Sequence, residues 1–172
     1  DTALDTHTLE KERGITIFAG QSHFNTENFH ITLLDTPGHV DFSTETERML
    51  KVLDYAVLVI SGTDGVQAHT RTLWKLLRSY NIPTFIFVTK MDFARFTQDE
   101  IMHNLRTLCG DSCVNFSNDD LHERNENIAI NDEEALEYFL ENDTITDHHV
   151  SRLVSSSLVC PCFFGSGLKM EG

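Results

Sequence analysis

Four short apolar runs, separated by segments with a helical pattern, constrain the fold of this chain more than any other feature. The runs are rich in Val, Ile, Leu and Phe, lack a clean alternation with polar residues, and lie at 30–34, 55–61, 84–89 and 160–165. Continuous apolar runs of this length are typical of strands that are buried on both faces of a parallel sheet. They therefore predict a parallel sheet that is covered by helices.

The segments between these runs carry apolar residues at helical spacing. The predicted helices lie at 43–53, 67–80, 98–108, 133–140 and 148–158. Apolar and polar residues alternate more regularly in residues 18–24 than in the four runs. This segment pairs naturally with the first apolar run as a hairpin across a turn at 25–28. Strands that alternate with helices indicate βαβ units, and so an α/β fold with a doubly wound, mostly parallel sheet.

The charge of the chain is strongly negative and unevenly distributed. A formal net charge of −14 argues against binding to nucleic acid or a membrane surface through bulk electrostatics, because phosphate groups attract net positive charge. Residues 119–147 hold eleven acidic residues and one basic residue, Arg124, which marks 111–157 as a distinct acidic segment. Two interpretations of this segment stay open, a solvated helical surface and a surface for a partner. No apolar run approaches the ~18 residues of a membrane span.

The four cysteines form two closely spaced pairs. Cys109 and Cys113 are four positions apart, and Cys160 and Cys162 are two apart, so neither pair is a CxxC motif. This spacing is poor for a structural zinc site. We expect buried or free thiols in a reducing compartment.

The first candidate motif, DTPGH at 35–39, follows the first apolar run, and the chemistry of an open α/β sheet sits at the carboxyl ends of its strands. The carboxylate of Asp35 can reach Mg²⁺ through a water, and Gly38 permits close approach of its amide to a phosphate. An ordinary strand-to-helix turn uses the same residue types.

Two further motifs follow the third and fourth runs. The carboxylate of Asp92 can accept two hydrogen bonds from the N1–H and N2–H₂ edge of guanine, a donor pair that adenine lacks, while the stem of Lys90 lies against the base. The small residues at 165–168 let backbone amides approach a ligand carbonyl. A polar strand exit and a glycine turn are the respective alternatives.

The segment 13–17, RGITI, carries Thr16 upstream of the hairpin. A threonine hydroxyl can join a Mg²⁺ shell directly, and a segment ordered by that contact and released after hydrolysis is a switch. The alternative is the start of a strand, since these residues have good β-propensity.

Taken together and in this order, the four motifs resemble the second to fifth motifs of the translational GTPase superfamily. The text at 12–17, 35–42, 52–59 and 65–71 is most similar to the tetracycline-resistance ribosomal protection proteins, with elongation factor G and release factor 3 next. His39, in place of glutamine, is characteristic of ribosome-associated GTPases. The resemblance is strong over 9–92 and 160–168 and loose over 93–159, where these families carry a variable insertion.

The resemblance implies roles on the phosphate side of a nucleotide site. Thr16 would ligate Mg²⁺, and Asp35 would hold it through a water. The amide of Gly38 would contact the γ-phosphate. His39 would be the catalytic residue that orients the attacking water on the ribosome.

It also implies roles on the base side. Asp92 would select guanine, Lys90 would pack on the base, and Ser166 and Gly167 would contact its O6 atom. Thr89 stands where the family has asparagine, and a hydroxyl makes only part of the hydrogen-bond network of that amide.

The family's first motif, the P-loop pattern GxxxxGK[ST], does not occur in these 172 residues. The resemblance thus implies a P-loop-NTPase-type sheet with helices on both faces, incomplete because the first strand, the P-loop and the last helix are absent. We expect residues 1–172 to be a partial GTPase domain with an acidic insertion at 111–157. We expect this fragment to be inactive.

For the parent protein the resemblance implies a cytoplasmic GTPase of the ribosomal protection type, which hydrolyses GTP on the ribosome. Its cofactors would be GTP or GDP and Mg²⁺, and its partner the ribosome, through ribosomal RNA and ribosomal proteins, with no membrane partner. An elongation-factor-G-like translocase, a release-factor-3-like GTPase and a non-catalytic fragment are the alternatives.

Overall fold

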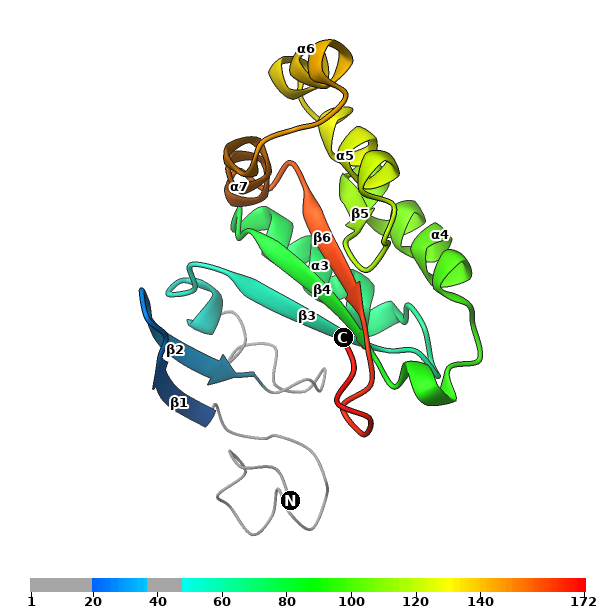
Figure 1. Ribbon diagram of the computed structural model, residues 1–172. Helices are drawn as coiled ribbons and strands as arrows, with labels where there is room; N and C mark the ends of the chain where they lie inside the picture. The colour runs from blue at the N-terminus through cyan, green and yellow to red at the C-terminus, as the bar shows by residue number, and fades with distance from the viewer. Residues whose placement is uncertain (1–19, 37–47) are drawn as a thin grey trace, which may run out of the picture. The chain divides into compact units, whose positions relative to one another are not determined.

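The computed structural model describes residues 20–36 and 48–172 of the chain (Figure 1). The chain divides into two compact units, Asp1–Leu53 and Asp54–Gly172. No helix in the described residues is both long enough and apolar enough to cross a membrane.

The first unit contains an antiparallel hairpin. Strand β1 (Gly20–Asn25) pairs with β2 (His30–Asp35), so that Gly20 lies opposite Asp35. The turn between them closes through the amide of Thr26, which donates to the carbonyl of Phe29 at 2.9 Å. The hairpin predicted from the sequence is confirmed. Of the predicted helix at 43–53, residues 48–50 are helical and residues 43–47 lie outside the described residues.

The second unit is built on a four-stranded parallel sheet with the order β3-β4-β6-β5. Its strands are β3 (Ala56–Ser61), β4 (Thr84–Thr89), β5 (Cys113–Asn115) and β6 (Cys160–Phe164). Three of them follow the predicted apolar runs, and β5 was not predicted. The predicted α/β class with a parallel sheet is confirmed.

Two helices pack on one face of this sheet, α3 (Ala68–Ser79) and α4 (Gln98–Cys109). Side chains alternate along a strand, so Leu58, Ile60, Ile86 and Val88 share this face. They form one core with Trp74 of α3 and with Ile101, Met102 and Leu105 of α4. The helix α4 begins with a capping box, in which Thr97 and Glu100 bond to each other's backbone amides.

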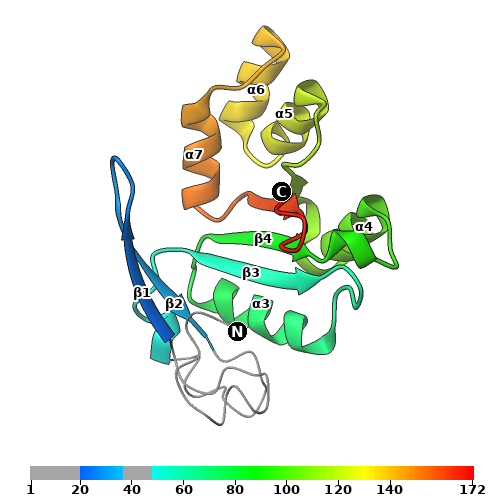
Figure 2. The ribbon, with the colours of Figure 1, turned by 60° about the horizontal axis from the view of Figure 1, so that its bottom comes forward.

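Three short helices lie on the other side of the sheet, α5 (Leu121–Ala129), α6 (Glu133–Asn142) and α7 (Asp147–Ser155). Figure 2 shows these helices on the side of the strands opposite α3. Their core consists of Val114, Ile128, Ala135, Leu153, Val154 and Val159. Helices therefore lie on both sides of the sheet, as predicted, although Val57 and Val59 of β3 stay exposed and α5 was not among the predicted helices.

Part of the acidity in this segment has a local structural role. The side chains of Asp120 and Asp132 cap the N-termini of α5 and α6, where a carboxylate faces unpaired amides and the positive end of the helix dipole. Asp132 also pairs with Arg152 of α7, and this hydrogen bond holds the pKa of the Asp132 carboxyl below its usual value. The observation favours a solvated helical surface, and the proposed domain bounds 111–157 stay a prediction.

The turns that follow β4 and β6 are joined by backbone hydrogen bonds. The amide of Gly165 donates to the carbonyl of Val88 at 2.9 Å, and the amide of Met91 donates to the carbonyl of Gly165 at 3.1 Å. Met91 is the first residue of the short 3₁₀ helix η2 (Met91–Phe93). Another 3₁₀ helix, η3 (Gly110–Ser112), links α4 to β5. The pairing of the two strands thus continues beyond their ends.

Close packing at Gly165 leaves no room for a side chain. A Cβ atom there would meet the carbonyl oxygen of Glu171 and would lie 2.9 Å from Cζ of Phe87. Glu171 belongs to a short bridge with Ser166, so its carbonyl oxygen does not move aside easily. At Gly167, by contrast, a Cβ atom would have no neighbour within 4 Å.

We predict that Gly165→Ala lowers the free energy of unfolding by about 1–3 kcal/mol, as overpacking of a tight contact does. Gly167→Ala is the matched control two residues away, and we expect it to leave stability unchanged or slightly increased because alanine restricts the unfolded chain. Urea denaturation followed by circular dichroism measures both. Equal losses for the two variants would contradict this account of the turn.

Candidate functional site

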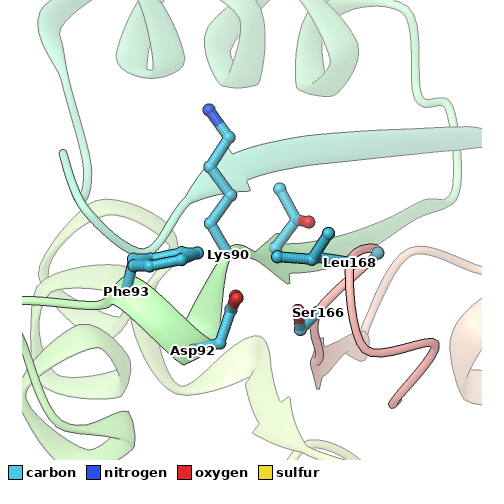
Figure 3. Close-up of a pocket in the computed structure, with 7 residues that line it drawn as sticks. Lys90, Asp92, Phe93, Ser166 and Leu168 are labelled. Carbon is cyan, nitrogen blue, oxygen red and sulfur yellow. The ribbon is translucent and has the colours of Figure 1, made fainter.

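A cavity of about 360 Å³ lies at the carboxyl ends of β4 and β6 (Figure 3). Its volume falls at the lower end of the range for small-molecule sites. It is lined by Thr89, Lys90, Asp92, Phe93, Ser166, Gly167 and Leu168. The parallel pairing of β4 with β6 thus brings the fourth and fifth motifs to one pocket, and all five base-side residues chosen from the sequence lie in its lining.

The pocket wall that follows β4 is shaped by a residue whose backbone adopts the left-handed conformation. Lys90 has φ 59° and ψ 34°, a backbone conformation that is uncommon outside glycine. This bend starts η2 and turns Asp92 toward the cavity. In Figure 3 the Asp92 carboxylate points into the space between Phe93 and Leu168, while the ammonium end of Lys90 points away from that carboxylate.

The wall contributed by β6 is a tight, internally bonded loop. Ser166 is 2% exposed, and its backbone exchanges two hydrogen bonds with Glu171, at 2.8 and 3.1 Å. Its hydroxyl oxygen accepts a hydrogen bond from the amide of Lys169 at 3.3 Å. The loop is therefore held in shape by its own contacts, and Gly167 beside it leaves space for a ligand.

Two apolar residues of the lining were given no role by the sequence reasoning. Phe93 is 65% exposed and Leu168 is 77% exposed, although both are large and apolar. They flank the Asp92 carboxylate as two apolar surfaces, an arrangement that suits a flat ring with polar edges. The available signal was their position, since Phe93 directly follows the fourth motif and Leu168 ends the fifth.

An acidic residue after β3 adds to the electrostatics of this edge. Asp64 accepts a hydrogen bond from the hydroxyl of Thr63 at 3.1 Å. Hydrogen bonds from Ser61 and Thr63 hold the pKa of the Asp64 carboxyl below its usual value, with a smaller contribution from the positive charge of Lys90. A carboxylate thus stays ionised near Lys90. The sequence reasoning did not select Asp64.

The phosphate-side residues belong to the first unit of the chain. Asp35 is the last residue of β2 in the first unit and is half-buried. Thr16, Gly38 and His39 lie outside the described residues. The roles given to these four residues stay predictions.

The sequence matches the family described as the elongation factor Tu GTP binding domain over residues 1–172. It is 37% identical to tetracycline resistance protein TetW of Butyrivibrio fibrisolvens over 96% of this chain and 28% of the relative. It is 33% identical to the oxytetracycline resistance protein of Streptomyces rimosus over 99% of this chain and 30% of the relative. The chain thus spans less than a third of the length of these curated relatives.

The fold has a counterpart among solved structures. A crystal structure of a Thermus thermophilus protein superposes with a TM-score of 0.81, at 22% identity, over 98% of this chain and 32% of that one. This likeness concerns the fold alone. With the family match along its whole length, the chain belongs to the elongation factor Tu GTP-binding domain family, and its curated relatives include tetracycline resistance proteins.

Proposed function

We propose that this chain is the guanine-nucleotide-binding part of a ribosome-dependent GTPase of the ribosomal protection type, acting in the cytoplasm. The observation that carries the proposal is the pocket between β4 and β6, where the fourth- and fifth-motif residues meet. The resistance proteins named above support the subtype. The alternative translocase and release-factor types share these motifs, so the pocket by itself does not select among them.

The base side of the site has a clear chemical logic. Two hydrogen bonds from guanine to the Asp92 carboxylate are charge-assisted, and adenine cannot make them because it lacks both donors. Phe93 and the stem of Lys90 supply apolar contact for the ring. Thr89 at the end of β4 replaces an amide by a hydroxyl, so we expect guanine selection to persist with a lower nucleotide affinity.

The phosphate side depends on residues of the first unit. Threonine hydroxyl and carboxylate oxygens are hard ligands that suit Mg²⁺, so Thr16 and Asp35 would hold it, the latter from the carboxyl end of β2. Bound Mg²⁺ neutralises charge that develops on the phosphates. The amide of Gly38 would bind the γ-phosphate, and His39 would orient the attacking water. Since these 172 residues contain no P-loop pattern, we expect weak nucleotide binding and no measurable hydrolysis by this chain alone.

We predict that Asp92→Asn, made in the full-length protein that contains this domain, lowers GTP affinity by about 100-fold or more. Each lost hydrogen bond to the charged carboxylate is worth about 1.5–3 kcal/mol. An asparagine amide can donate to the O2 atom of xanthine, so preference shifts toward xanthosine triphosphate. Competition binding with the three triphosphates of guanosine, xanthosine and adenosine measures both effects.

The matched control for this experiment is Asp99→Asn, which removes the same charge from an exposed position in the first turn of α4. We expect that variant to keep the wild-type order of affinities. Retained GTP preference in Asp92→Asn would mean that the pocket does not read the base through this carboxylate.

We predict that His39→Ala, again in the full-length protein, lowers ribosome-stimulated GTP turnover by about 100-fold or more while GTP affinity stays unchanged. The reason is that a positioned water, and not the bound nucleotide, would depend on this imidazole. Single-turnover hydrolysis with and without ribosomes is the measurement. His103→Ala, at an exposed position of α4, is the control. Unchanged stimulated turnover in His39→Ala would remove His39 from this role.

A further inference from the structure

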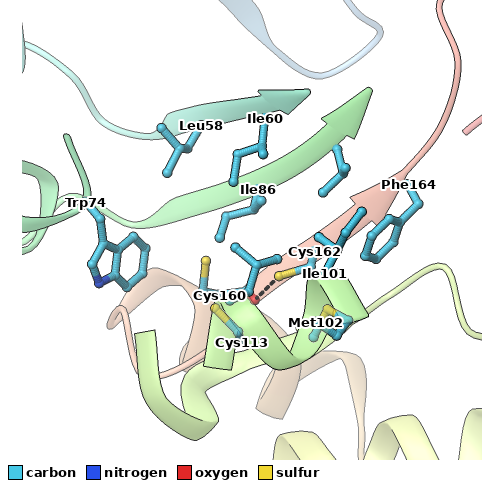
Figure 4. Packing of buried hydrophobic residues seen from close by; sticks show 12 residues of the cluster. Leu58, Ile60, Trp74, Ile86, Ile101, Met102, Cys113, Cys160, Cys162 and Phe164 are labelled. Atoms are coloured by element: carbon cyan, nitrogen blue, oxygen red, sulfur yellow. Dashed lines mark hydrogen bonds between the residues drawn. The ribbon is translucent and has the colours of Figure 1, made fainter. Parts of the chain in front are cut away.

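Three buried thiols gather in the core of the second unit, away from the nucleotide pocket. The Sγ atoms of Cys113, Cys160 and Cys162 all lie within 4.8 Å of one another. Each of the three side chains is at most 4% exposed, and all are free thiols. Figure 4 shows them beneath the strands, beside the apolar side chains of the core that the sheet forms with α3 and α4.

The fold, and not the sequence spacing, brings these residues together. In the parallel pairing of β5 with β6, Cys113 lies opposite Cys160. Cys160 and Cys162 are two positions apart on one strand, so their side chains point to the same face. The sequence reasoning considered a zinc site built from both cysteine pairs with His148 and His149 and found the spacing poor. The register between β5 and β6, which brings three of the thiols together, is not visible in the spacing.

A fourth thiol adjoins the cluster. Cys109 is the last residue of α4, is half-buried, and packs against the same core. Only the 3₁₀ turn η3 separates it from Cys113. Cys109 is the least buried of the four.

We propose that Cys109, Cys113, Cys160 and Cys162 form a structural zinc site. Tetrahedral Zn²⁺ with four thiolates has Zn–S bonds of about 2.3 Å, which places the sulfur atoms about 3.8 Å apart. Three of the sulfur atoms already lie within 4.8 Å of one another, so closure around an ion needs movements of about 1 Å or less for them. Cys109, which packs against the same core, would be the fourth ligand.

Two arginines contribute positive charge near these thiols. Four thiolates around one Zn²⁺ leave a net charge of −2, and a buried charge needs a partner. The positive charge of Arg106 acts on Cys113, and that of Arg78 acts on Cys109 and Cys160. Arg78 is held in place by a 2.6 Å hydrogen bond from its guanidinium to the carbonyl of Ser157, just before β6.

The site would have a structural purpose that is separate from nucleotide binding. It ties the end of α4 and the short strand β5 to β6, which leads directly into the fifth-motif loop. Zn²⁺ has no redox chemistry, and a four-thiolate shell leaves no open position, so the site would stabilise the fold and would not catalyse a reaction.

The first test uses the full-length protein that contains this domain, purified under reducing conditions and incubated with Zn²⁺ alone. We expect one zinc per chain by elemental analysis after dialysis, and a higher melting temperature than for the chelator-treated protein. Replacement by Co²⁺ should give the sulfur-to-metal charge-transfer band and the visible bands of a tetrahedral thiolate site. A zinc content near zero, with an unchanged melting temperature, would overturn the proposal and leave the thiols as ordinary core residues.

The second test compares two cysteine variants with a control. Cys160→Ser and Cys162→Val each remove one proposed ligand, and Cys162→Val also preserves the apolar packing. A loss of zinc binding in both variants therefore does not arise from one misfolded variant. We expect each to weaken zinc binding by about 100-fold or more, beyond the 10–100-fold typical of outer-shell changes. His148→Ala removes an exposed imidazole of α7, a group that can bind metal ions but lies outside the proposed site. This variant should bind zinc as the wild type does. Equal zinc binding by all three variants would show adventitious binding and refute the site.

Discussion

The parallel pairing of β4 with β6 is the interaction on which the rest of this structure depends. These strands are separated in sequence by an α-helix, an edge strand and three helices of the acidic segment, yet they are direct neighbours in the sheet. Because parallel strands end at the same edge, their pairing delivers Asp92 and Ser166 to one pocket. The long acidic segment is accommodated because its only strand adds at the far side of β6 and leaves this pairing intact.

The sequence predicted the elements whose signals are long and strong, and missed those whose signals are short. The β3, β4 and β6 runs are nearly continuous stretches of apolar residues. β4 and β6 have no exposed position, whereas β3 buries one face through Leu58 and Ile60. Strand β5 has three residues, too few for a periodic pattern, and it forms because β6 offers an unpaired edge. Helix α5 buries only Ile128 and Ala129, so it has no apolar stripe and depends on its Asp120 cap and on packing against α6.

The candidate site divides in the same way. Residues with strand-end chemistry, such as Lys90 and Asp92, were predicted because polar groups that follow a buried strand have few structural reasons to be there. Phe93 and Leu168 were given no role, because an apolar residue in a loop carries no chemical signature of its own. The cysteine cluster depends on the register of β5 against β6, and no spacing along the chain encodes that register.

The backbone bonds that join the two pocket walls have a kinetic consequence. Since Gly165 bonds to both Val88 and Met91, neither wall can swing outward alone without breaking main-chain hydrogen bonds. The two walls of the pocket therefore move as one rigid unit. Local opening at this edge of the sheet requires that the pairing of β4 with β6 breaks. The residence time of an aromatic ligand bound in this pocket is then governed by how often β4 and β6 separate locally, and less by the mobility of a surface loop.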